Sequence, residues 1–144
     1  MGGKPPRNEG SMSSGLLFDT SVWIDFFSGI DTNQTILLTK YIENDLSVFI
    51  CPVILQEVLQ GVGNDEHYQK IKNSLLEFNI LNEDPIEAAI GAANIYRKLR
   101  KKGLTIRKSN DCLIAWFSIK NSLEIVHNDR DFDVILNNIE LLRI

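Results

Sequence analysis

The chain alternates short apolar runs with longer segments that carry apolar residues at helical spacing. Short apolar runs bounded by polar residues or turn formers are typical of buried strands, and they cover residues 16–19, 48–51, 78–81, 123–126 and 139–144. The amphipathic segments predict helices at residues 21–28, 31–43, 52–60, 65–77, 84–102, 109–120 and 132–136. Because strands that alternate with helices favour parallel pairing, we expect an α/β fold, a three-layer α/β/α sandwich around a mainly parallel sheet of about five strands.

Small polar residues, prolines and glycines set the expected helix ends. Prolines stand at two predicted first helical positions and glycines follow three predicted last turns, as their backbone preferences favour. We expect Thr20 or Ser21 to cap the first helix, and Ser109 and Asn110 to cap the helix over 109–120. That helix is apolar all round, which predicts that it is buried.

The composition is that of an ordinary globular protein, with 44% hydrophobic and 24% charged residues. Residues 15–144 are expected to form one domain, whereas residues 1–14 are rich in Gly, Pro and Ser and predict a disordered leader or a remnant of an expression tag. No apolar run is long enough to span a membrane. Cys51 and Cys112 lack the spacing of a metal site, so we expect buried free thiols and a cytoplasmic location.

The net charge of −4 conceals a basic segment. Residues 97–108 hold seven Lys and Arg side chains and no acidic residue. Such a segment is either a solvated helix end, where cations complement the helix dipole, or a phosphate-binding surface. The sequence leaves both readings open.

Three aspartates follow structural elements in comparable ways. Asp19 ends the first strand, Asp111 lies in the first turn of the buried helix, and Asp129 lies just beyond the strand at 123–126. A fourth acid, Glu57, interrupts an otherwise apolar helix face. Singly, each has a structural explanation as a cap, a turn residue or a solvated side chain.

Together, these acids have a different meaning. The carboxyl ends of parallel strands meet at one edge of a sheet, so the four side chains are expected to converge there. Like charges gathered at one place repel one another and need a cation. Because oxygen-only ligands select hard ions, the pattern predicts a site for one or two Mg²⁺ or Mn²⁺ ions.

Four segments, LLFDTSVWIDFF, VILQEVLQGV, IRKSNDCLIAWFSIK and EIVHNDRDFDVI, stand in the order found in a known family. With them the chain resembles the PIN domain, and most closely the VapC-type ribonuclease toxins of bacterial toxin–antitoxin pairs. The most specific pieces are the hydrophobic-Asp-Thr-Ser opening and the endings ND-x-x-IA and ND-x-DF. The resemblance extends from residue 16 nearly to the C-terminus.

The resemblance implies a PIN-like fold and a metal-dependent endoribonuclease, whose products carry 5′-phosphate and 3′-hydroxyl ends. It implies four catalytic and metal-binding acids, with one further acid two residues after the last of them: Asp19, Glu57, Asp111, Asp129 and Asp131. Candidate contacts to substrate or to metal-bound water are Thr20, Ser21, Arg107, Lys108 and His127. His127 stands where many relatives have threonine.

The resemblance also implies partners. VapC-type proteins are held by a cognate antitoxin whose C-terminal segment covers the acidic groove, and homodimers are common among them. The aromatic residues of the first two helices are candidates for the dimer interface: Trp23, Phe26, Phe27 and Tyr41.

Other classes of function fit less well. A haloacid-dehalogenase-type phosphatase needs a second Asp two residues after the first, where this chain has Ser21. There is no GxGxxG and no GxxxxGK[ST], which argues against a dinucleotide site and a P-loop. A PIN-type nuclease of RNA processing outside toxin–antitoxin pairs stays open, as does a non-catalytic protein-binding module on the same fold.

Overall fold

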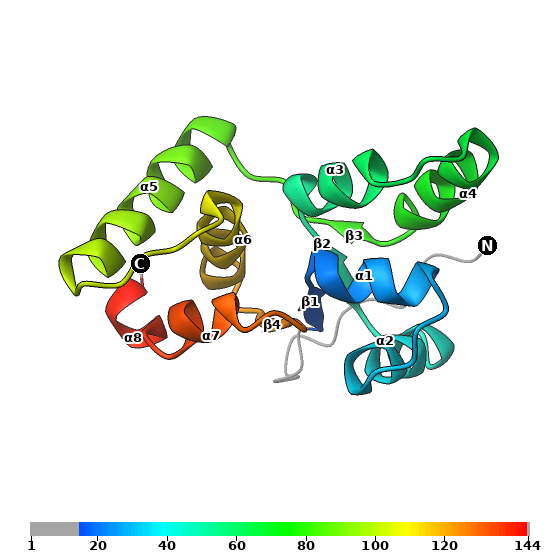
Figure 1. Ribbon diagram of the computed structural model, residues 1–144, viewed down its shortest axis with the longest axis horizontal. Coiled ribbons are helices and arrows are strands. Elements are labelled where there is room, and N and C mark those ends of the chain that lie inside the picture. The colour runs from blue at the N-terminus through cyan, green and yellow to red at the C-terminus, as the bar shows by residue number, and fades with distance from the viewer. Residues whose placement is uncertain (1–14, 144) are drawn as a thin grey trace.

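A parallel four-stranded sheet forms the centre of the computed structural model, which describes residues 15–143 (Figure 1). The strands are β1 (Leu16–Phe18), β2 (Val48–Ile50), β3 (Asn79–Ile80) and β4 (Glu124–Val126). Their order is β3-β2-β1-β4, so the first strand lies inside the sheet between β2 and β4. Leu16 and Leu17 are paired with Val48 and Phe49 on one side and with Glu124 and Ile125 on the other.

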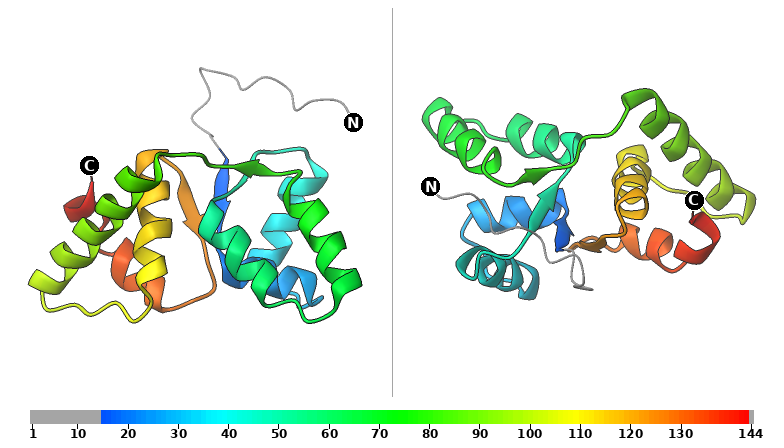
Figure 2. Two further views of the ribbon diagram at one scale, coloured as in Figure 1. Left: turned by 90° about the horizontal axis from the view of Figure 1, so that it is seen from above. Right: turned by 180° about the vertical axis from the view of Figure 1, so that it is seen from behind.

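Helices connect the strands and flank the sheet, as the alternation predicted (Figures 1 and 2). They are α1 (Thr20–Phe27), α2 (Asn33–Glu43), α3 (Pro52–Gln60), α4 (Asp65–Leu75), α5 (Pro85–Lys101), α6 (Ser109–Lys120), α7 (Asp131–Leu136) and α8 (Ile139–Leu142). The α/β/α architecture is therefore confirmed. The expected leader at residues 1–14 lies outside the described residues.

The predicted fifth strand over residues 139–144 is wrong. Ile139–Leu142 is a short helix, with Leu142 buried, and the sheet of the described residues has four strands. A short apolar run has no periodicity that separates a strand from a helical turn, so the packing of the chain around it decides. Here α8 packs against α5, and residues 139–142 pair with no strand of the sheet.

The aromatic residues of the first two helices pack against the core, but only Trp23 is fully buried. Trp23 is fully buried, and its indole N–H donates to the carbonyl of Phe18 over 3.0 Å. Phe26 and Phe27 pack on the Trp23 ring and are only partly buried. The expectation that Trp23 belongs to a dimer interface is therefore wrong, because no part of its side chain is exposed.

Helix α6 is buried on most sides, as its uniformly apolar sequence predicted. Its main neighbour is α5, and Gly91 makes this approach possible: a Cβ atom at this position would lie 2.0 Å from Nε1 of Trp116. Cys51 and Cys112 are buried free thiols, and burial raises their pKa values to about 12 and about 11. None of the described helices is both long and apolar enough to cross a membrane.

Candidate active site

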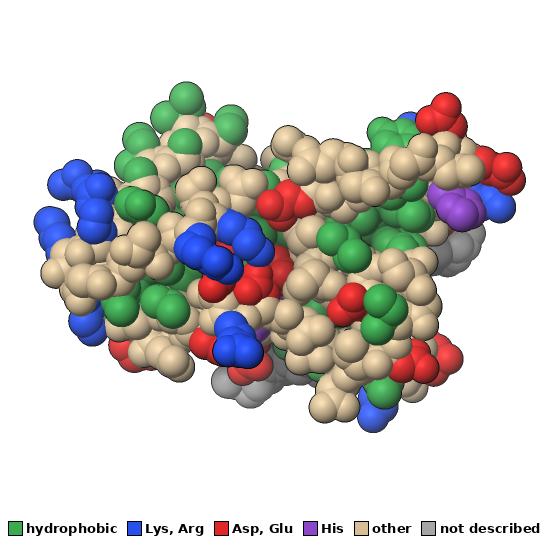
Figure 3. All heavy atoms as spheres, in the orientation of Figure 1, with side chains coloured by type: hydrophobic (Ala, Val, Ile, Leu, Met, Phe, Trp, Pro, Cys, Tyr) green, Lys and Arg blue, Asp and Glu red, His purple; other side chains and the backbone are tan. Residues whose placement is uncertain are grey.

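The carboxyl edge of the sheet gathers the residues that the sequence singled out. Asp19 directly follows β1, β4 leads into the turn that carries Asp129, and α6 begins at the same edge (Figure 2, left). In the space-filling view, acidic side chains meet in the middle of the face, in the hollow between the two halves of the molecule, with Lys and Arg side chains beside them (Figure 3). The convergence expected from a parallel sheet is thus present.

Asp19 is a buried carboxylate with a structural task of its own. Its backbone N–H continues the sheet by donating to the carbonyl of Val126 over 2.9 Å. Its Oδ2 accepts hydrogen bonds from the backbone N–H of Ser21 at 3.2 Å and from the Ser21 hydroxyl at 2.8 Å. Asp19 is therefore the N-cap of α1, and the assignment of the cap to Thr20 or Ser21 is wrong. A carboxylate accepts from the first-turn amides as a hydroxyl does, and its charge suits the helix dipole.

Asp111 is buried without a partner for one of its oxygens. Its side chain is in the first turn of α6, and its Oδ2 has no hydrogen-bond partner. Burial, followed by the nearby charge of Asp19, raises the pKa of Asp111 to about 7. The cap of α6 is Lys108, with no side-chain cap bond, so the prediction of Ser109 and Asn110 as caps is wrong. A buried carboxylate oxygen that has no hydrogen-bond partner and lies near a second acid is chemically suited to bind a cation.

Glu57 is held between two other elements. The Thr20 hydroxyl donates to its Oε1 over 2.6 Å, and the Asn110 amide donates to its Oε2 over 3.2 Å. The sequence suggested Thr20 as a substrate contact and Asn110 as a helix cap; neither suggestion included Glu57. Burial raises the pKa of Asp19, and the charge of Glu57 adds to that rise.

Asp129 and Asp131 are paired with the two cations that precede α6. The Lys108 ammonium is 2.7 Å from Oδ2 of Asp129, and the Arg107 guanidinium is 3.0 Å from Oδ2 of Asp131. The hydrogen bond from Lys108 lowers the pKa of Asp129. Oδ1 of Asp129 accepts from the backbone N–H of Asp131, an Asx-type turn. Arg107 and Lys108, which the sequence suggested as phosphate contacts, are therefore paired with carboxylates of the protein itself.

Ser21 joins the first strand to the last motif. While donating to Asp19, its hydroxyl accepts from the backbone N–H of Asn128 over 3.1 Å. The Asn128 amide donates to Asp25 of α1 over 3.2 Å. Sequence reasoning missed Asn128 and Asp25, although the paired ND motifs pointed to the first of them. Ser21 therefore positions the turn that carries Asp129.

His127 faces its own turn. Its Nδ1 accepts from the backbone N–H of Asp129 over 3.3 Å, and its Nε2 is 3.6 Å from a carboxylate oxygen of Asp133. The ring packs on Phe132 with 5.4 Å between the ring centres. His127 therefore lies beside Asp129. Its contact with substrate stays a prediction.

The donor set suits a hard cation, although its members are not assembled around one point. Among residues 15–143, no three His, Cys, Asp or Glu side chains are grouped closely enough to hold a metal ion as they stand. One of these acids, Asp129, is instead paired with the ammonium group of Lys108. The unpartnered Oδ2 of Asp111 and the all-oxygen chemistry fit Mg²⁺ or Mn²⁺.

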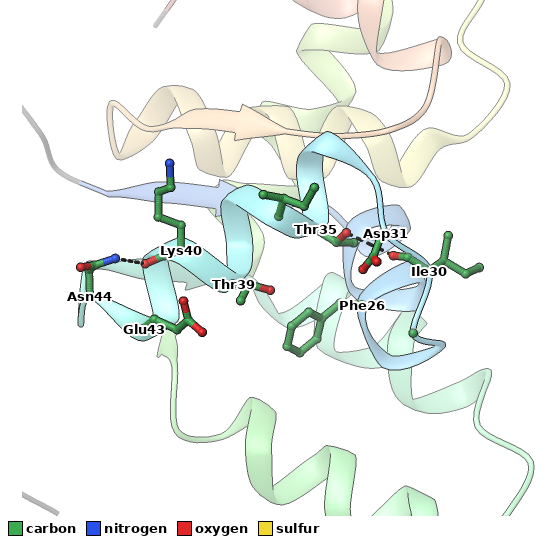
Figure 4. A pocket seen from close by; sticks show the side chains of 10 residues that line it. Phe26, Ile30, Asp31, Thr35, Thr39, Lys40, Glu43 and Asn44 are labelled. Carbon is green, nitrogen blue, oxygen red and sulfur yellow. Dashed lines mark hydrogen bonds between the residues drawn. The ribbon is translucent and has the colours of Figure 1, made fainter.

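A separate pocket of about 490 Å³ lies at the end of α1 and along α2 (Figure 4). Its lining includes Phe26, Ile30 and Lys40, and none of the four acids named above. Polar groups there bond within the pocket wall, as the Thr35 hydroxyl does to the carbonyl of Ile30. The pocket therefore takes no part in the site formed by those acids.

Three comparisons with known proteins agree with this geometry. The family model described as the PIN domain matches residues 16–136. A VapC ribonuclease of Mycobacterium bovis and the ribonuclease VapC11 of Mycobacterium tuberculosis are each 33% identical over 121 residues, which cover 83% of this chain and 90% of theirs. The crystal structure of VapBC2 from Rickettsia felis, bound to a DNA fragment from its promoter, superposes with a TM-score of 0.68 at 19% identity, over 85% of this chain and 94% of that one.

Proposed function

This chain belongs to the PIN domain family, and we propose that it is a metal-dependent endoribonuclease that acts as the toxin of a type II toxin–antitoxin pair. The observation that carries the proposal is the buried Oδ2 of Asp111, which lacks a partner next to the buried carboxylate of Asp19. Two buried acids side by side repel each other and cost stability, so their joint placement supports the proposal that a cation binds between them. The likeness to the VapC ribonucleases supports RNA as the substrate.

Asp19, Asp111 and Asp129 are the residues that would hold one or two Mg²⁺ or Mn²⁺ ions, with Glu57 acting through a water molecule and Asp131 as an additional acid. When bound, the metal lowers the pKa of a water molecule and stabilises the charge that develops on the phosphate. The reaction is hydrolysis: a water oxygen bonds to phosphorus, the bond to the 3′ oxygen breaks, and the products carry 5′-phosphate and 3′-hydroxyl ends.

The protein side chains orient this reaction. Ser21 fixes one oxygen of Asp19, so that this carboxylate presents a constant geometry. Thr20 and Asn110 hold both oxygens of Glu57. We assign to Oε2 of Glu57, whose bond to Asn110 is the longer one at 3.2 Å, the role of accepting the proton from the attacking water.

The acidic site also suits a cationic side chain of an antitoxin. The Lys108 ammonium, seated on Asp129, is an internal example of such an interaction. The structure of VapBC2 describes a complex bound to promoter DNA, and an antitoxin partner for this chain follows by analogy. We further propose that the chain forms a homodimer and acts in the cytoplasm. Phe26, Phe27 and Tyr41, which are partly buried, stay candidates for its interface.

The proposed activity is tested with purified protein, total RNA and Mg²⁺ or Mn²⁺, followed by mapping of the product ends. We expect 5′-phosphate and 3′-hydroxyl ends, no cleavage in excess EDTA, and loss of cleavage in Asp19→Asn. Cyclic phosphate ends, or full activity in EDTA, would overturn the metal-dependent mechanism.

The Lys108–Asp129 pair favours one alternative, a non-catalytic protein-binding module whose acidic cluster is neutralised internally. That reading predicts that Asp19→Asn and Asp111→Asn leave any RNA cleavage by the preparation unchanged. Loss of cleavage in both variants would exclude it.

A further inference from the structure

A groove of about 450 Å³ lies between α5 and the first turns of α6. At one end are Ser109 and Asn110, and the Asn110 amide donates to Glu57. Arg97 and Arg100 of α5 line the groove further along. The groove is therefore continuous with the proposed active site through a residue that contacts one of its acids.

The two arginines of this groove are available to an anion. Neither forms an ion pair with any residue in the described part of the chain. The Arg100 guanidinium instead lies over the ring of Tyr96, 5.6 Å from its centre. In contrast, Arg107 and Lys108 are engaged with Asp131 and Asp129. An RNA strand that approaches an acidic site needs cations that are free to meet its phosphates, and α5 supplies two.

The remaining walls are apolar. They are formed by Ala92, Ala93, Leu113 and the Tyr96 ring, and the alanines leave room between the two helices. An apolar surface with an aromatic ring, bordered by guanidinium groups, has the chemistry of sites that bind single-stranded nucleic acid: phosphates contact the cations, and sugars and bases lie on the apolar wall. Planar guanidinium groups can also bind a phosphate through two parallel hydrogen bonds.

We propose that the α5–α6 groove binds the RNA strand next to the scissile phosphate, with backbone phosphates on Arg97 and Arg100. This inference rests on the proposed ribonuclease function and adds the path of the substrate to it. It also divides the basic segment over residues 97–108 into residues with different tasks. Arg97 and Arg100 face the groove, Arg107 and Lys108 face the acids, and Lys98 and Lys101 line neither.

Lys98 and Lys101 provide a matched control, because they stand on the same helix and carry the same charge. Lys98 lines a different and smaller pocket with Trp116, and Lys101 does not line the α5–α6 groove. The variants Arg97→Gln/Arg100→Gln and Lys98→Gln/Lys101→Gln therefore change the net charge equally. Thermal unfolding of both establishes that each is folded.

Binding is measured by fluorescence anisotropy with a labelled single-stranded RNA, and both double variants carry Asp111→Asn so that the RNA is not cut. We expect the arginine variant to weaken binding at least ten-fold, and to reduce the slope of log Kd against log salt by about 1.4, the value for two phosphate contacts on a single strand. The lysine variant is expected to weaken binding less than three-fold. In the cleaving background, the arginine variant should raise KM and leave kcat within about three-fold.

Equal weakening by the two double variants, or no effect of the arginine variant, would overturn the proposal. Intact RNA binding together with a lost homodimer or lost antitoxin binding would do so too, since the groove would then be a protein interface. A wild-type protein that binds RNA through the two arginines and cuts none of it would support the groove and refute the ribonuclease function. The two proposals thus fail by different results.

Discussion

The Lys108 ammonium lies 2.7 Å from Oδ2 of Asp129, so the residue that caps α6 neutralises the acid that follows β4. The pair joins two segments that are 21 residues apart in the sequence. Both side chains are partly exposed, and the pair therefore costs little to break. It gives the acidic site an internal counter-ion, which a metal bound at Asp129 would have to displace.

Lys108→Gln is expected to bind Mn²⁺ more tightly than the wild type. A metal that uses Asp129 no longer has to displace an ammonium group, and an exposed ion pair of this kind corresponds to about a two- to five-fold change in Kd. Isothermal titration calorimetry measures this Kd directly. Lys98→Gln, which removes the same charge away from the acids, should leave the Kd unchanged, and an unchanged Kd in Lys108→Gln would show that the pair does not compete with the metal.

Asp111 makes the stability of the protein without metal fall as the pH rises. Its pKa is raised to about 7 in the folded state from an ordinary value of 3.8, so between these values the unfolded chain gives up a proton that the folded protein retains. The free energy of unfolding should drop by a few kcal/mol across this range, since one unit of pKa shift corresponds to about 1.4 kcal/mol, and level off above pH 7. Asp19, whose pKa is also raised, acts in the same direction.

Urea unfolding in EDTA at pH 5 and pH 8 tests this expectation. Asp111→Asn removes the titrating group and should flatten most of the difference, and it should be more stable than the wild type at pH 8. The lowered pKa of Asp129 has the opposite sign, but its effect is confined to pH values below about 4. A wild type that is more stable at pH 8 than at pH 5 would contradict the assignment.

We expect Thr20 to act on catalysis through Glu57. Its hydroxyl donates to Oε1 over 2.6 Å, and Thr20→Val keeps the shape of the side chain while removing this bond. We expect kcat for RNA cleavage to fall about ten-fold, equivalent to about 1.4 kcal/mol, with little change in KM. The decisive measurement is a double-mutant cycle: in the Glu57→Gln background, Thr20→Val should have a much smaller effect. Independent, additive effects would mean that Thr20 contacts the substrate itself.

Gly91 is required by the packing of α5 on α6. A Cβ atom at this position would lie 2.0 Å from Nε1 of the Trp116 ring, which is buried and cannot move freely. Gly91→Ala should therefore lower the free energy of unfolding by about 1–3 kcal/mol, despite the higher helix propensity of alanine. Gly63→Ala is the control, because nothing lies within 4 Å of its Cβ position. Equal stability of the two variants in urea unfolding would contradict the packing argument.

The sequence by itself determined the architecture and the chemistry of the site. Apolar runs and helical spacing predicted the succession along the chain of strands β1 to β4 and helices α1 to α7, because these patterns reflect which side of each element is buried. The acids could be found because parallel strands present their carboxyl ends at one edge. The prediction of a strand over residues 139–144 was wrong, since a single turn of helix and a short strand have the same apolar pattern.

The tertiary structure alone decided which partners the acids have. Lys108 with Asp129, Arg107 with Asp131, and Asn110 with Glu57 are pairs separated by 21, 24 and 53 residues. Such contacts depend on how far the elements are rotated and shifted against one another, and no local pattern records that. The same holds for Asp19. The sequence suggested that it is a metal ligand and that Thr20 or Ser21 caps the helix, but in the structure Asp19 is the N-cap of α1. The direction of β1 and the first turn of α1 place its carboxylate within hydrogen-bond distance of the Ser21 amide.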